Sequence, residues 1–255
     1  MEEAIKKADV LIEALPYIKE FHRKTMVIKY GGSILGEEKI RRGVLEDIVF
    51  LSYMGLCPVL VHGGGPNISE RMKSEGLKTE FVDGMRVTDE KTLEIVEQEL
   101  NKLNKMIVSE INELGGKAVS FLSLSRPCVQ GRDKDEGIII ARKKIGPSKD
   151  LGLVGEIEEV NIKPILTRTK NYTICVICPM GKGKDGKTYN INADDAAARV
   201  AISLSSEKLV VLTNVQGIMR SLPRPGAQGR GEEEQASFIS TLTVDEAKKL
   251  IEDGA

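Results

Sequence analysis

Short apolar runs alternate along this chain with longer segments in which apolar residues recur at every third or fourth position. The runs are typical of buried strands and the longer segments of amphipathic helices. Their alternation predicts an α/β fold with an open, mostly parallel sheet sandwiched by helices. We expect strands at 25–30, 58–62, 117–124, 137–142, 154–160, 172–179 and 209–213, and helices through 5–18, 45–49, 68–72, 92–114, 194–204 and 243–253. Segments 181–186 and 220–237 are expected to be loops.

The first helical segment carries an apolar stripe that needs a partner surface. Two partners fit the pattern: the body of the same subunit, which we favour, or a second subunit. The stripe consists of Ile5, Ala8, Leu11, Ile12, Leu15 and Ile18.

Composition narrows the class of protein. Of the 255 residues 41% are hydrophobic, so the chain can bury a substantial core. Lys and Arg number 37 against 38 Asp and Glu, which leaves no positive excess to attract nucleic acid or a membrane surface. No segment approaches about 18 consecutive apolar residues, and the first 24 residues lack a signal-peptide core. We therefore expect a cytosolic protein with neither nucleic-acid nor membrane partners.

Two of the four cysteines, Cys175 and Cys178, form a C-x-x-C pattern; the others are Cys57 and Cys128. This pattern can indicate redox or metal chemistry. In an extended strand, however, residues three apart lie about 10 Å apart on opposite faces, whereas a disulfide requires Cα atoms within about 7 Å. No second cysteine or histidine pair completes a zinc set. We expect neither a disulfide nor a metal site here.

Two glycine loops, Gly31-Gly-Ser33 and Gly63-Gly-Gly-Pro66, directly follow predicted strands. In open α/β sheets ligands collect at the carboxyl ends of strands. Glycines let backbone N–H groups approach an anion, and a following helix N-terminus adds partial positive charge. Neither loop is a Walker A or G-x-G-x-x-G motif. Anion binding and a simple turn both remain open for each loop.

Three polar features stand out beside these loops. Lys29 interrupts a run that otherwise favours burial, so it either snorkels from a sheet edge or points into a site. Arg86 is either a surface charge or a planar fork that grips a carboxylate. Asn190, Asn192 and Asp194 precede a helix, where such residues are usually caps.

Together these segments resemble the amino-acid kinase family, and within it the N-acetylglutamate kinases, over residues 10–255. Several ordered motifs at the family's spacing are more specific than any one of them. The resemblance lies in Ala14-Leu-Pro-Tyr-Ile-Lys-Glu-Phe21, Val27-Ile-Lys-Tyr-Gly-Gly-Ser33, Val61-His-Gly-Gly-Gly-Pro66, Gly84-Met-Arg-Val-Thr-Asp89, Leu153-Val-Gly-Glu156, Tyr189-Asn-Ile-Asn-Ala-Asp194 and Leu212-Thr-Asn-Val-Gln-Gly217.

The resemblance implies transfer of the γ-phosphoryl group of ATP, with Mg²⁺, to the γ-carboxylate of N-acetyl-L-glutamate in arginine biosynthesis. It also implies a homo-oligomer, either a dimer or a hexamer through the N-terminal helix, and leaves open binding of a nitrogen-signalling PII protein. By resemblance, Lys29 stabilises the phosphoryl group and Asp194 orients the catalytic lysines. Acetylglutamate would be bound by Gly64, Gly65, Arg86 and Asn190, and the nucleotide by Gly31, Gly32, Thr213, Asn214 and Gly217.

The chemistry supports these roles independently. A carboxylate nucleophile is already ionised at neutral pH, so the reaction needs no general base. Catalysis then rests on positioning and on neutralising the charge of two anionic reactants, which lysines, backbone N–H groups and Mg²⁺ can do.

The chain also departs from the family pattern. Asn214 stands where relatives usually have aspartate, and the chain ends at Ala255 where relatives continue to a second catalytic lysine. We therefore expect an N-terminal helix at 1–24, an acetylglutamate-binding lobe at 25–206 and an incomplete nucleotide-binding lobe at 207–255, with binding of acetylglutamate but poor turnover. The alternatives are an amino-acid kinase with another acceptor and a non-catalytic acetylglutamate-binding protein.

Overall fold

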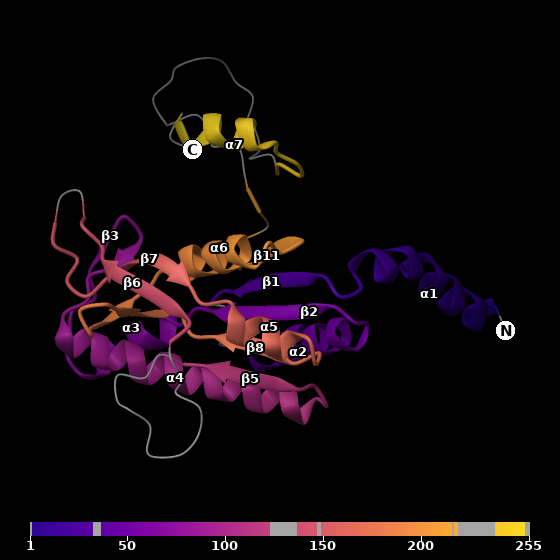
Figure 1. Cartoon of the computed structure of the whole chain (residues 1–255), viewed down its shortest axis with the longest axis horizontal. Helices are drawn as coiled ribbons and strands as arrows, with labels where there is room; N and C mark the ends of the chain where they lie inside the picture. The colour runs from indigo at the N-terminus through magenta and orange to yellow at the C-terminus, as the bar shows by residue number, and fades with distance from the viewer. Residues whose placement is uncertain are drawn as a thin grey trace, which may run out of the picture. The chain divides into compact units, whose positions relative to one another are not determined.

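Five parallel strands form the central sheet of the computed structural model, in the order β11-β1-β2-β8-β5 (Figure 1). All four pairings in it are parallel. The sheet confirms the mostly parallel α/β fold expected from the sequence. Its strands are β1 (Thr25–Tyr30), β2 (Cys57–His62), β5 (Ala118–Phe121), β8 (Ile174–Ile177) and β11 (Lys208–Leu212).

The structure describes residues 2–32, 37–122, 137–146, 149–215, 217–218 and 238–252. Ser33, Cys128, Gln216, the expected loop at 220–237 and the side chain of Leu11 lie outside the described part. The chain divides into two compact units, Met1–Leu212 and Thr213–Ala255. The break between the units follows Leu212, whereas the nucleotide-binding lobe was expected to begin at 207. The strand β11 belongs to the first unit, in which it pairs with β1.

Helices cover both faces of the central sheet, because neighbouring residues of a strand point to opposite faces. Val27 joins a core cluster with Ala196 and Ala197, whereas Ile28 joins another cluster with Leu45 and Ile107. The helices of the first unit are α1 (Glu2–Phe21), α2 (Glu38–Tyr53), α3 (Gly65–Ser74), α4 (Glu90–Glu113), α5 (Lys163–Thr169) and α6 (Ala193–Ser203); the second unit contains α7 (Val244–Glu252).

A second sheet has the strand order β10-β9-β6-β7, and a hairpin joins β3 (Phe81–Val82) to β4 (Met85–Arg86). The sequence predicted a loop at 181–186, and this prediction is wrong for residues 181–183. These residues belong to β9, which pairs with both β10 and β6. Gly181 permits this packing, since a Cβ there would lie 2.5 Å from the Ala141 Cβ. The strands are β6 (Ile139–Lys143), β7 (Gly155–Val160), β9 (Met180–Gly183) and β10 (Thr188–Asn190).

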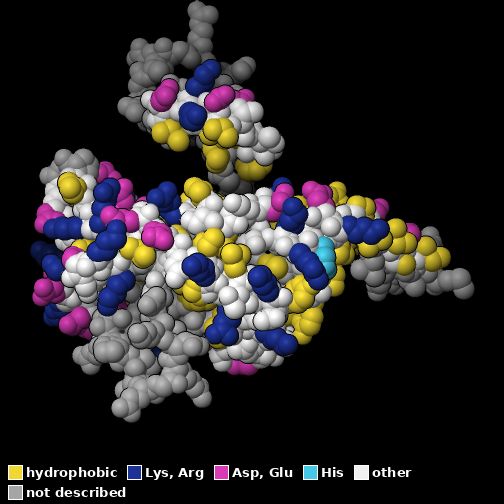
Figure 2. Space-filling view, in the orientation of Figure 1, with side chains coloured by type: hydrophobic (Ala, Val, Ile, Leu, Met, Phe, Trp, Pro, Cys, Tyr) yellow, Lys and Arg dark blue, Asp and Glu magenta, His cyan; other side chains and the backbone are white. Residues whose placement is uncertain are grey.

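Two expectations about burial are wrong. The run at 209–213 was expected to be buried, but β11 is an edge strand in which Leu209 and Val211 are 41% and 49% exposed. The stripe on α1 was expected to pack on its own subunit, but Ile5, Ile12 and Leu15 are exposed, and apolar side chains gather along this helix in Figure 2. An apolar run shows that a segment favours burial, but it does not show which surface will cover that segment.

The side chains of Cys57, Cys175 and Cys178 are buried, and none of the three forms a disulfide. Burial raises the pKa of Cys175 to about 12. Among the described residues, no helix is long and apolar enough to cross a membrane.

Candidate active site

The two glycine loops meet at the carboxyl ends of β1 and β2. The Gly63 N–H donates to the Tyr30 carbonyl at 2.9 Å. A Cβ at Gly32 would lie 2.9 Å from Pro66 Cδ and 3.1 Å from Gly65 N, closer than real side chains pack. Glycine at position 32 therefore leaves space over the backbone nitrogens of the second loop.

The second loop leads into the N-terminus of α3. Gly64 is the N-cap, and Pro66 occupies the first turn. A Cβ at Gly64 would lie 2.6 Å from Leu100 Cδ2, so α4 packs tightly behind the loop, whereas a Cβ at Gly65 would meet nothing within 4 Å among the described residues. The first N–H groups of a helix have no intrahelical partner and attract anions. The loop is thus closed behind and open in front, as an anion site requires.

Lys29 and Asp194 form an ion pair beside these loops, with Nζ 3.0 Å from Oδ1. Lys29 does not snorkel from an edge, because β1 lies between β11 and β2 and the lysine side chain is 13% exposed. Asn192 is the N-cap of α6 and accepts hydrogen bonds from the backbone N–H groups of Asp194 and Asp195. Because Asn192 caps the helix, the Asp194 carboxylate is available to hold the lysine.

Arg86 is buried, so the surface-charge alternative is wrong. Its Nη2 donates to the Gly65 carbonyl at 3.0 Å and to Ser69 Oγ at 2.8 Å, and its guanidinium lies 4.8 Å from the centre of the Phe81 ring. Burial lowers the pKa of Arg86. The guanidinium therefore brings positive charge to the first turn of α3, directly beside the open glycine.

Asn190 is tied to the Arg86 segment through Thr88, a link that our sequence reading missed. Asn190 Nδ2 donates to Thr88 Oγ1 at 3.1 Å, and Thr88 Oγ1 donates to the Arg86 carbonyl at 2.7 Å. The backbone of Leu153 completes the cluster: its N–H donates to the Thr88 carbonyl, and its carbonyl accepts from the Asn190 N–H. The Gly84, Leu153 and Tyr189 motifs thus converge in space, which their order in the chain does not reveal.

A buried polar network behind the glycine loop was also missed. His62 is fully buried, and burial lowers its pKa to about 4. Asn104 Nδ2 donates to His62 Nε2 at 3.1 Å, which leaves Nδ1–H to donate to the Gly63 carbonyl at 3.1 Å. Asn104 also donates to the Val176 carbonyl and accepts from the Ser120 hydroxyl. A histidine directly before three glycines was the available sequence signal.

The nucleotide residues expected from the sequence fall in both units. Gly31 lies in the first unit, where its N–H donates to the Leu212 carbonyl at 3.2 Å. Thr213, Asn214 and Gly217 belong to the second unit, in which Thr213 Oγ1 accepts from the Val215 N–H at 3.4 Å. Within the described residues, no group of three His, Cys, Asp or Glu side chains could hold a metal ion.

The sequence of this chain matches a family model and several curated proteins. The Amino acid kinase family model matches residues 24–255. A protein named acetylglutamate kinase from Caldanaerobacter subterraneus subsp. tengcongensis is 46% identical over 253 residues, which cover 99% of this chain and 78% of that protein. Another protein of the same name, from Halothermothrix orenii, is 44% identical and is covered to 82%.

Among solved structures, N-acetylglutamate synthase from Neisseria gonorrhoeae complexed with coenzyme A and N-acetyl-glutamate is similar with a TM-score of 0.78 and 26% identity. The match covers 96% of this chain and 51% of that one. Giardia carbamate kinase shares the fold at a TM-score of 0.51 and 15% identity. The matches to the family model and to the curated relatives, each over nine-tenths or more of the sequence, show that this chain belongs to the amino acid kinase family.

Proposed function

We propose that this protein phosphorylates the γ-carboxylate of N-acetyl-L-glutamate with ATP, giving N-acetylglutamyl 5-phosphate in arginine biosynthesis. The observation that carries the proposal is the similarity, over 99% of the chain, to proteins named acetylglutamate kinase. The Lys29–Asp194 pair beside two converging glycine loops supports it, because phosphoryl transfer to a carboxylate requires positive charge between two anionic reactants.

In this proposal Lys29 neutralises charge on the phosphoryl group during transfer. A lysine ammonium is a flexible point charge, so its position depends on its partner. The Asp194 carboxylate, 3.0 Å from Nζ, holds the ammonium at the carboxyl end of β1. Asp194 is thus a positioning residue for Lys29.

The acetylglutamate is held by Gly64, Gly65, Arg86 and Asn190. The open N-terminus of α3 offers N–H groups to a carboxylate, and Arg86 adds positive charge through its bond to the Gly65 carbonyl. Asn190 holds the other end of the substrate, with its side-chain amide oriented by Thr88. Because the Asn190 N–H also donates to Leu153, the backbone at this position is fixed before substrate arrives.

ATP enters as its Mg²⁺ complex. Mg²⁺ is usually held by nucleotide phosphates and water with few protein carboxylates. In this proposal the glycines at 31 and 32 approach the phosphates, and the family resemblance also assigns nucleotide binding to Thr213, Asn214 and Gly217.

The test measures ADP release by the purified chain with ATP, Mg²⁺ and each of N-acetylglutamate, glutamate and aspartate. We expect turnover with N-acetylglutamate at the low rate anticipated from the sequence, and loss of that turnover in Lys29→Ala but not in Lys24→Ala. Lys24 is a matched control, because it lies just before the same strand and its exposed ammonium pairs with Glu207 instead. Turnover with another acceptor would refute the substrate assignment. Calorimetric binding of N-acetylglutamate without any ADP release would refute catalysis and favour a binding protein.

We also propose that the exposed apolar face of α1 docks on a second copy of this chain. Ile5, Ile12 and Leu15 leave apolar surface in water that a partner subunit would cover. Sedimentation should show a smaller assembly for Ile12→Glu than for the wild type. An unchanged assembly would refute the role of this helix.

A further inference from the structure

A cavity lies near the amino ends of the central strands, opposite the glycine loops at their carboxyl ends. Its volume is about 320 Å³. Four separate segments line it: His22 after α1, the end of α2 with Gly55, residues 115–117 between α4 and β5, and residues 171–172 between α5 and β8. Gly55 precedes β2 and Gly63 follows it, so the length of a six-residue strand, about 20 Å, separates this cavity from the glycine loops.

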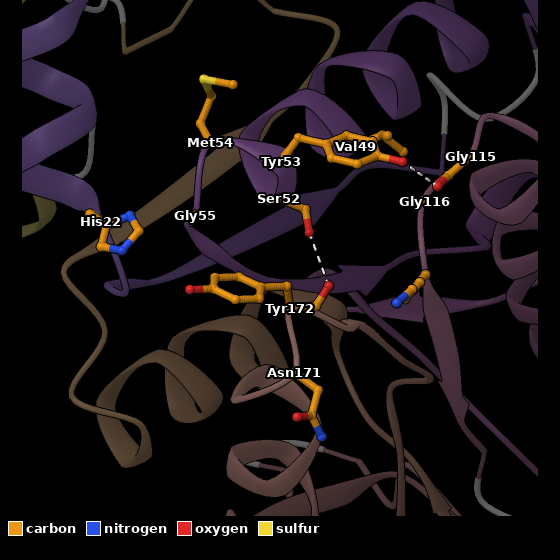
Figure 3. Close-up of a pocket in the computed structure, with 11 residues that line it drawn as sticks. His22, Val49, Ser52, Tyr53, Met54, Gly55, Gly115, Gly116, Asn171 and Tyr172 are labelled. Atoms are coloured by element: carbon orange, nitrogen blue, oxygen red, sulfur yellow. Dashed lines mark hydrogen bonds between the residues drawn. The ribbon is translucent and has the colours of Figure 1, made fainter.

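The cavity wall is built by specific hydrogen bonds (Figure 3). The Ser52 hydroxyl donates to the Tyr172 carbonyl at 3.1 Å, and the Tyr53 hydroxyl donates to the Gly115 carbonyl at 2.7 Å. Both bonds join the last turn of α2 to a loop that precedes a strand. The cavity is therefore a fixed feature of the connections between these elements.

Backbone strain at the cavity is concentrated on an aromatic residue. Tyr172 has φ of +55°, in the left-handed region that bulky residues rarely adopt. Such conformations cost free energy and cluster at functional sites. Tyr172 nevertheless carries its ring into the lining, and Figure 3 shows this ring with those of His22 and Tyr53 around the cavity.

The lining combines flat apolar surface with unpaired polar groups. Two tyrosine rings and Val49 provide the apolar surface. Lys117 supplies an ammonium and Asn171 an amide, and neither side chain has a hydrogen bond or ion pair within the part of the chain that the structure describes. The described lining residues include no Asp or Glu. A cation with no acid beside it favours an anionic ligand.

We propose that this cavity binds a small ligand with a flat, apolar body and one carboxylate group. The rings pack against the flat body, and the Lys117 ammonium pairs with the carboxylate. The volume is at the lower end of the range of about 300–1,000 Å³ for small-molecule sites, so the ligand is about the size of one substituted ring. Because the cavity and the glycine loops lie at opposite ends of the central strands, this ligand does not compete with N-acetylglutamate.

The test uses benzoate as the probe and benzamide as its uncharged match, with binding measured by saturation-transfer NMR. We expect benzoate to bind and benzamide to bind more weakly. Lys117→Gln should weaken benzoate binding by about twofold to fivefold, since an exposed ion pair is lost. The control Lys91→Gln removes an exposed lysine from the opposite end of α4 and should have no effect.

Tyr172→Gly provides a second variant that is expected to fold, because glycine adopts a positive φ without strain. It should abolish benzoate binding by removing one wall, with thermal unfolding as the check on folding. Saturating N-acetylglutamate should leave the benzoate signal unchanged. The absence of benzoate binding, equal binding by Lys117→Gln and Lys91→Gln, or displacement by N-acetylglutamate would each overturn the proposal.

Discussion

Acid should destabilise this protein through one histidine, His62. The unfolded chain binds a proton on this imidazole below pH 6.5, whereas burial lowers the pKa in the folded protein to about 4. Above pH 6.5 the His62 imidazole is neutral in both the folded and the unfolded protein, so it does not make stability depend on pH. As pH falls from 6.5 to 4, only the unfolded state gains the proton, so the folded state loses relative stability.

The magnitude follows from the same values. Each pH unit over which only the unfolded state is protonated costs about 1.4 kcal/mol, so the interval from 6.5 to about 4 costs about 3 kcal/mol. Protonation would also place a hydrogen on Nε2, which now accepts from Asn104, and would leave two donors facing each other. The Gly63 carbonyl, which accepts from Nδ1–H, would stay paired.

The assay is urea unfolding of the wild type and His62→Gln at several values between about pH 7.5 and about pH 4.5. Carboxylates titrate in both proteins, so the difference between the two proteins isolates the histidine. We expect the wild type to be more stable at neutral pH and its advantage to shrink by about 2 to 3 kcal/mol across the range.

The chain has two histidines, which makes the control simple. His22→Gln removes the exposed one and should keep the wild-type pH dependence. In proton NMR the imidazole signal that survives in His22→Gln should not titrate between about pH 8 and about pH 5. Parallel loss of stability in the wild type and His62→Gln, or a normal titration of that signal, would refute the reasoning.

The remaining predictions concern the proposed active site. Lys29→Ala should lower turnover by about 100-fold or more with little change in either Michaelis constant, because its charge acts mainly in the transition state; unchanged turnover in ADP release would exclude it. Arg86→Lys should weaken N-acetylglutamate binding by about 1 to 3 kcal/mol in calorimetry, with less effect on ATP, and equal weakening of both would contradict the assignment. Asn190→Ala should raise the Michaelis constant for N-acetylglutamate, and an effect confined to ATP kinetics would contradict this role. Asp194→Ala should lower turnover while thermal stability changes little, whereas Asn192→Ala should cost about 1 kcal/mol of stability as a lost helix cap; the reverse pattern would exchange the two roles.

The order of strands and helices could be predicted from the sequence because periodicity is a local property. A short apolar run that ends at glycines, such as 25–30, favours a buried strand, and the structure places β1 at those residues. The glycine loops were predictable for the same reason, since each directly follows a strand. In the second sheet β6 and β7 were expected, but β9 and β10 were not, because both are short and Gly181 and Gly183 in β9 are typical of turns.

The sequence by itself thus determined the α/β class, the glycine loops and the residues that could carry charge chemistry. Only the tertiary structure decided which of those residues meet: Lys29 with Asp194, Arg86 with the first turn of α3, and Asn190 with Thr88. It also decided that β11 is an edge strand and that His62 is buried. The physical reason is that periodicity reports which face of a helix or strand is apolar, whereas contacts between distant segments depend on strand order, which no local pattern encodes.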